Sequence, residues 1–269
     1  MHKRIHFHKQ LLIVLTLILL ITGCSSLPSV DTDALISTQE KAIQISNGKG
    51  FISPARSAEI INALKASSGA KDILEKHLAL EEAIVGHPLT TGNKVTLLKD
   101  GPATYASMFN ALEKAKHHIN LETYIFDDDD IGRKFAETLR QKQINGVQVN
   151  IIYDSVGALS TAKEFFDQLR SVGIRVLEFN PVNPLNAKGE WQINQRDHRK
   201  LMVVDGQIAF IGGINISGVY SKGSSSLNRT KKKGSFPWRD THIRVEGPAV
   251  KDFQTYLYGK RSKQWQKEQ

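Results

Sequence analysis

Hydrophobic residues follow two different periods along the central part of the chain. From Gly92 onward, short apolar runs typical of strands alternate with longer amphipathic stretches typical of helices. We predict strands at Lys94–Leu98, Ile119–Phe126, Val147–Tyr153 and Ile174–Phe179, and helices at Ala103–Lys116, Arg133–Gln143 and Ala162–Val172. Gly146 and Gly173 stand where a glycine commonly ends a helix. This alternation predicts an α/β layered fold.

The segments on either side of this pattern differ from it. Apolar residues recur at helix spacing between about Ser53 and Val85, which predicts a short helical region before the α/β part. We interpret His77 and His87, in or beside this region, as structural residues. Asn180–Asn194 holds two prolines and follows neither period, so it predicts a loop. A final helix is predicted at Ala249–Trp265.

The residues around Asp205-Gly206 predict a β-hairpin. A β-type run ends at this pair and resumes at Gln207, and Asp-Gly is a strong signal for a tight turn. If only these two residues form the turn, the expected pairs are Val204 with Gln207, Lys200 with Ile211 and His198 with Gly213.

The same hairpin gathers side chains suited to binding a phosphate. His198 and Lys200 are two residues apart on an extended chain, so they share a face, with Cα atoms about 6.6 Å apart. Asn215 is expected on that face too. Gly212 and Gly213 remove side-chain bulk beside the imidazole. We therefore expect a hollow lined by a nucleophile, a cation and an amide donor, with Lys200, Gly213 and Asn215 holding the phosphate.

His198, Lys200 and Asp205 have the spacing HxKxxxxD, which resembles the motif of the phospholipase D superfamily. Gly212–Asn215 resembles the sequel of that motif. The likeness to bacterial cardiolipin synthases extends from about Leu89 to Trp265 and includes the segments Leu121–Phe126 and Trp238–His242. It implies a phospholipase D-like fold, in which a mixed β-sheet is flanked by helices.

The resemblance also implies a role for each motif residue. His198 would attack phosphorus and form a phosphohistidine, which divides one difficult displacement into two easier steps. Lys200 would hold the nonbridging oxygens as negative charge develops on them. Asn215 would add a neutral hydrogen bond. Simple alternatives are a surface histidine and lysine on an edge strand, and a turn-forming asparagine.

Two aspartates differ in what they offer to His198. Seven residues of extended chain would put Asp205 about 23 Å from His198, so we assign Asp205 a structural role at the turn or on a neighbouring strand. Asp240 resembles the acid that single-motif relatives place against the histidine, where it would orient the imidazole. Pairing with Arg239, or capping a strand end, is an equal alternative. His242 is interpreted as structural.

The N-terminus resembles a bacterial lipoprotein signal. A basic stretch precedes the apolar run Leu11–Ile21, which as a helix is only about 16 Å long and is too short to span a bilayer. Ile21–Cys24 resembles a lipobox, whose cysteine is lipidated, and Cys24 is the chain's one cysteine. A short uncleaved anchor is the alternative. We expect a signal peptide at 1–23, a tether and helical region at 24–90, and the phospholipase D-like domain at 91–269.

The formal net charge of +9 favours anionic partners such as phospholipid headgroups, nucleic acid or phosphate esters. A Ser- and Lys-rich loop between Ser217 and Trp238 could meet such a partner, and an ordinary solvated loop is an equal alternative. Its basic residues are Lys222, Arg229, Lys231, Lys232 and Lys233.

Metal and nucleotide cofactors are not expected. The chain has no GxxxxGK(S/T) loop, no GxGxxG after a strand and no Cys/His cluster with metal spacing. The four acids Asp127–Asp130 follow a predicted strand and precede a predicted helix. Carboxylates are favourable at a helix N-terminus, so we expect them to cap that helix.

The chain departs from the family in carrying one motif, where an active site normally uses two histidines. A homodimer would supply the second across a twofold axis; otherwise the chain lacks its second half. Three hypotheses remain. The first is an exported phosphatidyltransferase or phospholipase D, lipid-anchored in the bacterial envelope and facing the periplasm, that acts on membrane phospholipid. The second is a homodimeric endonuclease acting on DNA, which we favour less. The third is a truncated, noncatalytic lipoprotein.

Overall fold

The computed structural model describes residues 45–47, 49–68, 89–183, 194–222 and 238–259. The chain divides into two compact units, Met1–Ile43 with Pro54–His87, and Gln44–Ser53 with Pro88–Gln269. In the first unit the structure describes helix α3 (Pro54–Ser68), which begins the predicted helical region. The expected signal peptide, Cys24, the tether and the rest of that region lie outside the described residues.

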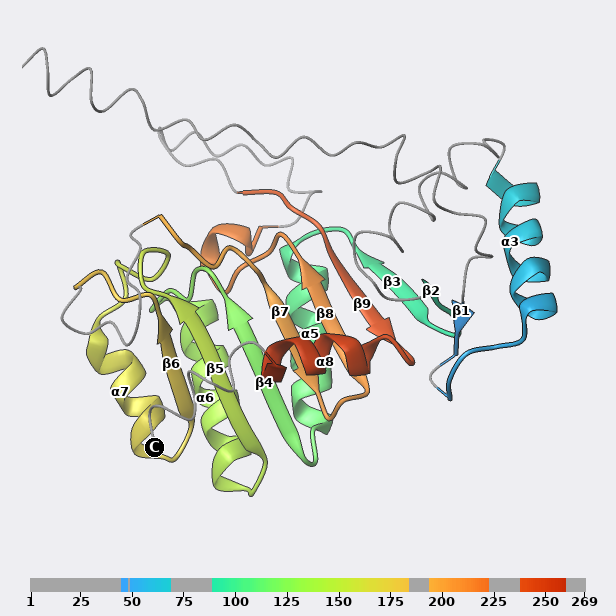
Figure 1. Cartoon of the computed structure of the whole chain (residues 1–269). Coiled ribbons are helices and arrows are strands. Elements are labelled where there is room, and N and C mark those ends of the chain that lie inside the picture. The colour runs from blue at the N-terminus through green and yellow to red at the C-terminus, as the bar shows by residue number, and fades with distance from the viewer. Residues whose placement is uncertain (1–44, 48, 69–88, 184–193, 223–237, 260–269) are drawn as a thin grey trace, which may run out of the picture. The chain divides into compact units, whose positions relative to one another are not determined.

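A seven-stranded mixed sheet forms the centre of the second unit (Figure 1). Strands β4, β5 and β6 are parallel, and each further pairing from β4 across to β3 is antiparallel. In spatial order the strands are β3 (Lys94–Leu98), β9 (His242–Glu246), β8 (Ile208–Gly212), β7 (Leu201–Val204), β4 (His118–Thr123), β5 (Gln148–Asp154) and β6 (Arg175–Phe179). A separate parallel pair joins β1 (Ile45–Ser46) to β2 (Leu89–Thr90).

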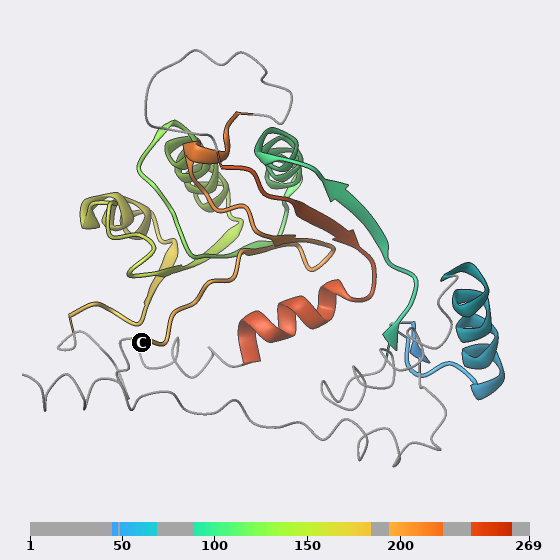
Figure 2. The same ribbon diagram turned by 90° about the horizontal axis from the view of Figure 1, so that it is seen from above.

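Helices cover both faces of the sheet, as Figure 2 shows. Helices α5 (Gly101–Lys114), α6 (Asp130–Ile144) and α7 (Lys163–Ser171) lie on one face, and α8 (Val250–Gly259) lies on the other. The larger core lies on the three-helix side and includes the fully buried Phe135 and Phe210. A smaller core joins Val203 and Val245 of the sheet to Leu257 of α8. The short 3₁₀ helix η2 (Gly218–Tyr220) follows β8.

The strands and helices predicted between Lys94 and Phe179 are present, with ends displaced by a few residues. The predicted final helix is present as α8, and its predicted end lies outside the described residues. Strand β4 stops at Thr123, before the predicted end at Phe126, because Phe126 leaves the sheet ladder and forms an isolated bridge with Ile216. Helix α6 begins earlier than predicted because Asp129 caps it, its carboxylate accepting hydrogen bonds from the N–H groups of Ile131 and Gly132. Asp129 therefore has the predicted capping role.

The predicted hairpin is present, but its register was wrong by one residue. Asp205 and Gly206 have φ values of 53° and 65°, and the Gln207 N–H donates to the Val204 carbonyl at 3.0 Å, as a tight turn requires. Val204 nevertheless pairs with Ile208, so Gln207 is an extra residue outside the ladder. The Gly212 N–H consequently donates to the Lys200 carbonyl at 3.4 Å, where Ile211 had been predicted as the partner of Lys200.

The displaced register follows from the attachment of Asp205 to the chain that leads into β4. The Asp205 N–H donates to the His118 carbonyl at 2.9 Å and so extends the pairing between β7 and β4. Its carboxylate accepts three further hydrogen bonds, from the backbone N–H groups of Lys116, His117 and His118, at 2.8 to 2.9 Å. These bonds hold its pKa below the usual range, although partial burial opposes them. Asp205 therefore has a structural role.

Replacing Asp205 should destabilise the protein because three N–H groups lose their acceptor. We expect Asp205→Ala to lower the free energy of unfolding by about 2 to 4 kcal/mol in urea denaturation. Asp205→Asn keeps one carbonyl oxygen and tolerates a positive φ, so its loss should be smaller. Asp252→Asn, an exposed acid on α8, is the control. Equal losses in the two Asp205 variants would refute the hydrogen-bond explanation.

Candidate active site

The candidate residues gather where β4 and β8 end and where β7 and β9 begin. His198 and Lys200 lie in a segment without regular secondary structure that leads into β7. His198 is exposed, whereas Lys200 is buried, with 5% of its surface accessible. Both contact Tyr124, just beyond β4: its ring centroid lies 4.6 Å from that of the imidazole and 5.2 Å from the Lys200 ammonium nitrogen. The structure therefore brings His198 and Lys200 together around one aromatic ring.

Burial changes the acid–base properties of Lys200. It lowers the pKa of Lys200 to about 8, while the negative charges of Asp197 and Asp240 oppose that fall. The Lys200 ammonium group donates a hydrogen bond to the His198 carbonyl at 2.6 Å. Lys200 therefore titrates within about one pH unit of neutrality. Its charged form is hydrogen-bonded to the backbone of His198.

Gly212 and Gly213, at the end of β8, make room for Asp240 and His242 and not for the predicted His198 imidazole. A Cβ atom on Gly213 would lie 2.1 to 2.2 Å from the carboxylate atoms of Asp240. A Cβ atom on Gly212 would lie 2.6 Å from the Cα atom of His242, its partner across the sheet. The expectation that these glycines leave space beside the His198 imidazole was therefore wrong. It depended on the mistaken hairpin register.

Asp240 lies two residues before β9 and is exposed. Its carboxylate accepts a hydrogen bond from the Thr241 N–H at 2.7 Å and acts electrostatically on Lys200 and His242. Among the described residues, no hydrogen bond joins Asp240 to the His198 ring. Orientation of the imidazole by Asp240 therefore stays a prediction.

His242 is almost wholly buried, with 1% of its surface accessible. Its Nδ1 accepts a hydrogen bond from the Ile214 N–H at 3.3 Å. Burial lowers the pKa of His242 to about 4; the Asp240 carboxylate opposes this fall and the Lys200 charge adds to it. The ring is therefore neutral at pH 7 and belongs to the packed interior, in keeping with its structural interpretation.

Asn215 joins the segment after β8 to the end of β4. Its side-chain oxygen accepts from the Ile125 N–H at 3.0 Å, and its amide nitrogen donates to the Tyr220 hydroxyl at 3.0 Å. The Tyr105 hydroxyl of α5 donates to the backbone carbonyls of Asn215 and Ser217. Asn215 thus has a structural task, and phosphate binding by its side chain stays a prediction.

Sequence reasoning assigned no role to several residues that hold the motif in place. Tyr124 was recognised only as part of a matching segment. Arg199, between the two motif residues, lies 3.1 Å from Glu122 of β4 and 2.8 Å from Asp197. A useful signal was available, because Glu122 is a single charge in the otherwise uncharged run Leu121–Phe126, and such a residue needs a buried partner.

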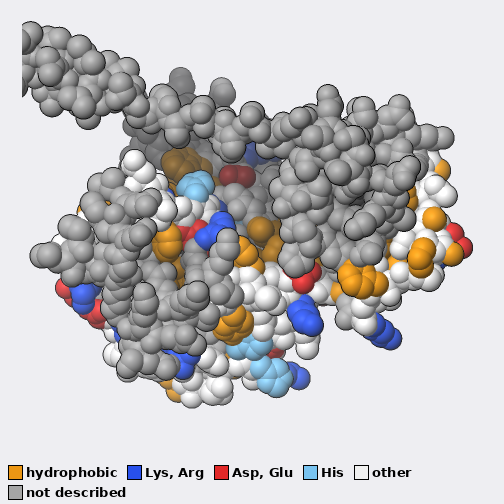
Figure 3. All heavy atoms as spheres, in the orientation of Figure 1, with side chains coloured by type: hydrophobic (Ala, Val, Ile, Leu, Met, Phe, Trp, Pro, Cys, Tyr) orange, Lys and Arg blue, Asp and Glu red, His pale blue; other side chains and the backbone are white. Residues whose placement is uncertain are grey.

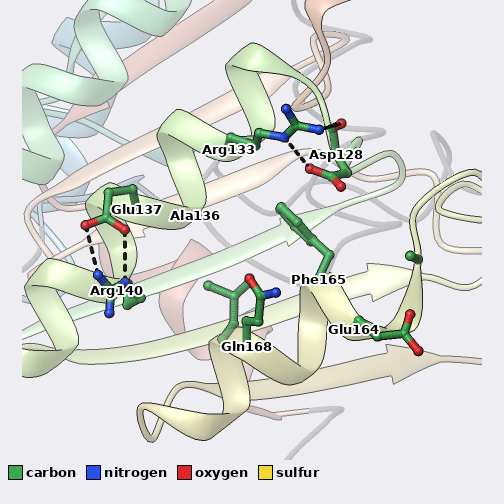
Figure 4. A pocket seen from close by; sticks show the side chains of 10 residues that line it. Asp128, Arg133, Ala136, Glu137, Arg140, Glu164, Phe165 and Gln168 are labelled. Atoms are coloured by element: carbon green, nitrogen blue, oxygen red, sulfur yellow. Dashed lines mark hydrogen bonds and ion pairs between the residues drawn. The ribbon is translucent and has the colours of Figure 1, made fainter.

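A surface hollow of about 500 Å³ lies away from these residues, between α6 and α7 (Figure 4). Four of its charged side chains are paired, Arg133 with Asp128 and Arg140 with Glu137, and it contains none of the predicted site residues. Within the described ranges, no three His, Cys, Asp or Glu side chains are grouped so as to hold a metal.

The described part of the chain contains no helix with the length and apolar character needed to cross a membrane. In the described part of the face in Figure 3, basic, acidic and hydrophobic side chains are interspersed. Most of the predicted basic loop lies outside the described residues.

Part of the chain matches a known protein family. The family model described as cardiolipin synthase, PLD-like domain, matches residues 108–227, which include His198, Lys200 and Asn215. The cardiolipin synthase of Geobacillus thermodenitrificans is 38% identical over 179 residues, covering 66% of this chain and 33% of that protein. Residues 108–227 therefore resemble a phospholipase D-like domain. The major cardiolipin synthase of Bacillus subtilis is 38% identical over 168 residues, covering 62% of this chain and 32% of that protein.

The chain thus spans about a third of the length of the curated relatives that it matches. Solved structures show a weaker likeness. A phospholipase D family member from Salmonella typhimurium is 16% identical, with a TM-score of 0.45, covering 64% of this chain and 95% of that chain. The phosphatidylserine synthase of Haemophilus influenzae is 16% identical, with a TM-score of 0.46, covering 62% and 36% respectively.

The pKa of Lys200 offers a direct test of the site's electrostatics. We expect NMR of the lysine side chain to give a midpoint near pH 8. Asp240→Asn should move the midpoint to lower pH, because it removes a negative charge that stabilises the ammonium form. Glu137→Gln, whose carboxylate binds Arg140 and Gln141 on α6, should leave it unchanged. An unmoved midpoint in Asp240→Asn would mean that Asp240 does not act on Lys200.

Proposed function

We propose that the chain provides one half of a phospholipase D-type active site that cleaves or transfers the phosphatidyl group of membrane phospholipids. The observation that carries the proposal is the pairing of an exposed imidazole with a buried lysine. His198 is accessible to a substrate, and Lys200 lies beside it against the same Tyr124 ring. The 38% identity to cardiolipin synthases supports a phospholipid as the substrate in preference to other phosphodiesters.

The proposed reaction has two displacements at phosphorus. An imidazole nitrogen of His198 attacks, the bond from phosphorus to the leaving alcohol oxygen breaks, and a phosphohistidine forms. Lys200, in its charged form, stabilises the nonbridging oxygens as negative charge develops on them. An acceptor hydroxyl then attacks phosphorus and releases His198. Water as acceptor gives phosphatidic acid, and phosphatidylglycerol gives cardiolipin.

The leaving oxygen needs a proton, and a second motif histidine would donate it. A second copy of this chain, related by a twofold axis, or a separate half would supply that residue. Lipid attachment at Cys24 and the net charge of +9 would hold such an enzyme at an anionic membrane surface in the bacterial envelope. These features suit a substrate that is itself part of the membrane.

Activity should depend on His198. We expect the full-length chain to release headgroup or form cardiolipin from labelled phosphatidylglycerol vesicles, and His198→Ala to slow this by at least about 1,000-fold, because no nucleophile remains. Mass spectrometry of the acid-quenched protein should detect the phosphohistidine peptide only with His198 present. His117→Ala is the matched control, because His117 is also exposed but lies before β4.

Unchanged turnover in His198→Ala would refute the proposal. A folded chain that is inactive on lipid vesicles but cleaves a DNA oligonucleotide would refute the choice of phospholipid and support the nuclease alternative. Sedimentation of the active sample should give the mass of a dimer if two copies complete the site.

A further inference from the structure

The segment that carries His198 has an unusual attachment to the fold. Residues 195–199 precede β7 and belong to no strand, and the backbone hydrogen bond from Gly212 reaches only as far as Lys200. Side chains hold the segment instead. The Asp197 N–H donates to the carboxylate of Asp154 at 2.8 Å, and Asp154 is fully buried at the end of β5. The Arg196 guanidinium donates to the Ser155 hydroxyl and to the Asn180 carbonyl.

Arg199, the residue after His198, makes a further attachment. Its Nε donates to the Asp197 carboxylate at 2.8 Å and lies 3.1 Å from the Glu122 carboxylate of β4. The Glu122 side chain is fully buried and that of Asp197 is 2% exposed, so one guanidinium lies between two carboxylates that have little water around them. Burial acts to lower the pKa of Arg199, but the Asp197 hydrogen bond and the Glu122 charge outweigh it and raise the pKa.

Helix α8 completes the surroundings of this guanidinium. The Tyr256 ring centroid lies 4.8 Å from the Arg199 guanidinium carbon, which is the geometry of a cation–π contact. Arg199 therefore connects three parts of the unit: the end of β4 through Glu122, the loop through Asp197 and the last described helix through Tyr256. His198 and Lys200 both contact Tyr124 instead.

We propose that Arg199 is a positioning residue for the nucleophile. By binding Glu122 and Asp197, it fixes the path of the backbone on both sides of His198, and that path holds the imidazole against Tyr124. Arginine suits the task because the Nε atom of its planar fork lies close to both carboxylates while the guanidinium carbon lies over Tyr256, and a lysine has no nitrogen at that position. The inference rests on the proposed function for its catalytic consequence, but the position of the imidazole can be measured without turnover.

The test compares Arg199→Gln with Arg140→Gln. Arg140 is a matched control, because its side chain is 39% exposed against 43% for Arg199, and it too pairs with a carboxylate, Glu137 of α6. We expect Arg199→Gln to lower kcat on phosphatidylglycerol vesicles by about 100-fold, as a displaced nucleophile does. KM should change less than about threefold, because Arg199 is not expected to touch the lipid. Arg140→Gln should change neither.

A second readout follows the imidazole itself. In histidine-labelled protein, the His198 ring signal is assigned by its loss in His198→Ala. We expect Arg199→Gln to shift this signal, because the ring leaves its contact with Tyr124. Arg199→Lys should also shift it, because lysine restores the charge without the fork. A wild-type His198 signal together with a wild-type kcat in Arg199→Gln would overturn the proposal.

A double variant covers the case in which Arg199→Gln alone does not fold. Glu122→Gln with Arg199→Gln also removes the buried negative charge at position 122, so the melting temperature should recover toward that of the wild type. The His198 signal should remain displaced. A recovered signal in the folded double variant would count against positioning by Arg199. If the wild-type chain itself is inactive on lipid, the proposed function fails, while the His198 signal still decides the role of Arg199.

Discussion

Strand β4 is bonded in parallel to β5 on one side and antiparallel to β7 on the other, so the direction of the sheet changes along its length. Every part of the candidate site depends on this pairing. The beginning of β4 is tied to the hairpin through Asp205, and its end leads into Tyr124, which contacts His198 and Lys200. Glu122, one position before the end of β4, meets Arg199 from the segment that leads into β7. A single pair of strands thus sets both the fold and the position of the nucleophile.

The parts of the fold that could be predicted from sequence are those governed by local chemistry. Hydrophobic periodicity placed the strands and helices, and the cap at Asp129 follows from a carboxylate before a helix. The hairpin register could not be predicted in this way. It depends on the bonds between Asp205 and residues 116–118, which are nearly ninety positions away in the chain. A turn signal contains no information about such a partner.

The same limit applies to the site. The motif spacing identified His198 and Lys200, and the structure places both on Tyr124. The surroundings of His198 were predicted less accurately. The predicted hairpin register, wrong by one residue, placed His198 over Gly212 and Gly213, but His242 and Asp240 occupy that space. Residues that act on the motif from other strands, such as Glu122, have no spacing rule that connects them to it. Their contacts exist only once the sheet has formed.

The turn at Asp205-Gly206 also affects how the protein ages. In an Asp-Gly pair, the glycine nitrogen can attack the aspartate carboxyl carbon and close a five-membered imide with loss of water, since glycine has no side chain to hinder the approach. In the folded protein, three N–H groups hold that carboxylate toward the start of β4. Folding therefore slows imide formation at Asp205-Gly206. The amount of imide formed at this position would increase with the time that a molecule has spent unfolded.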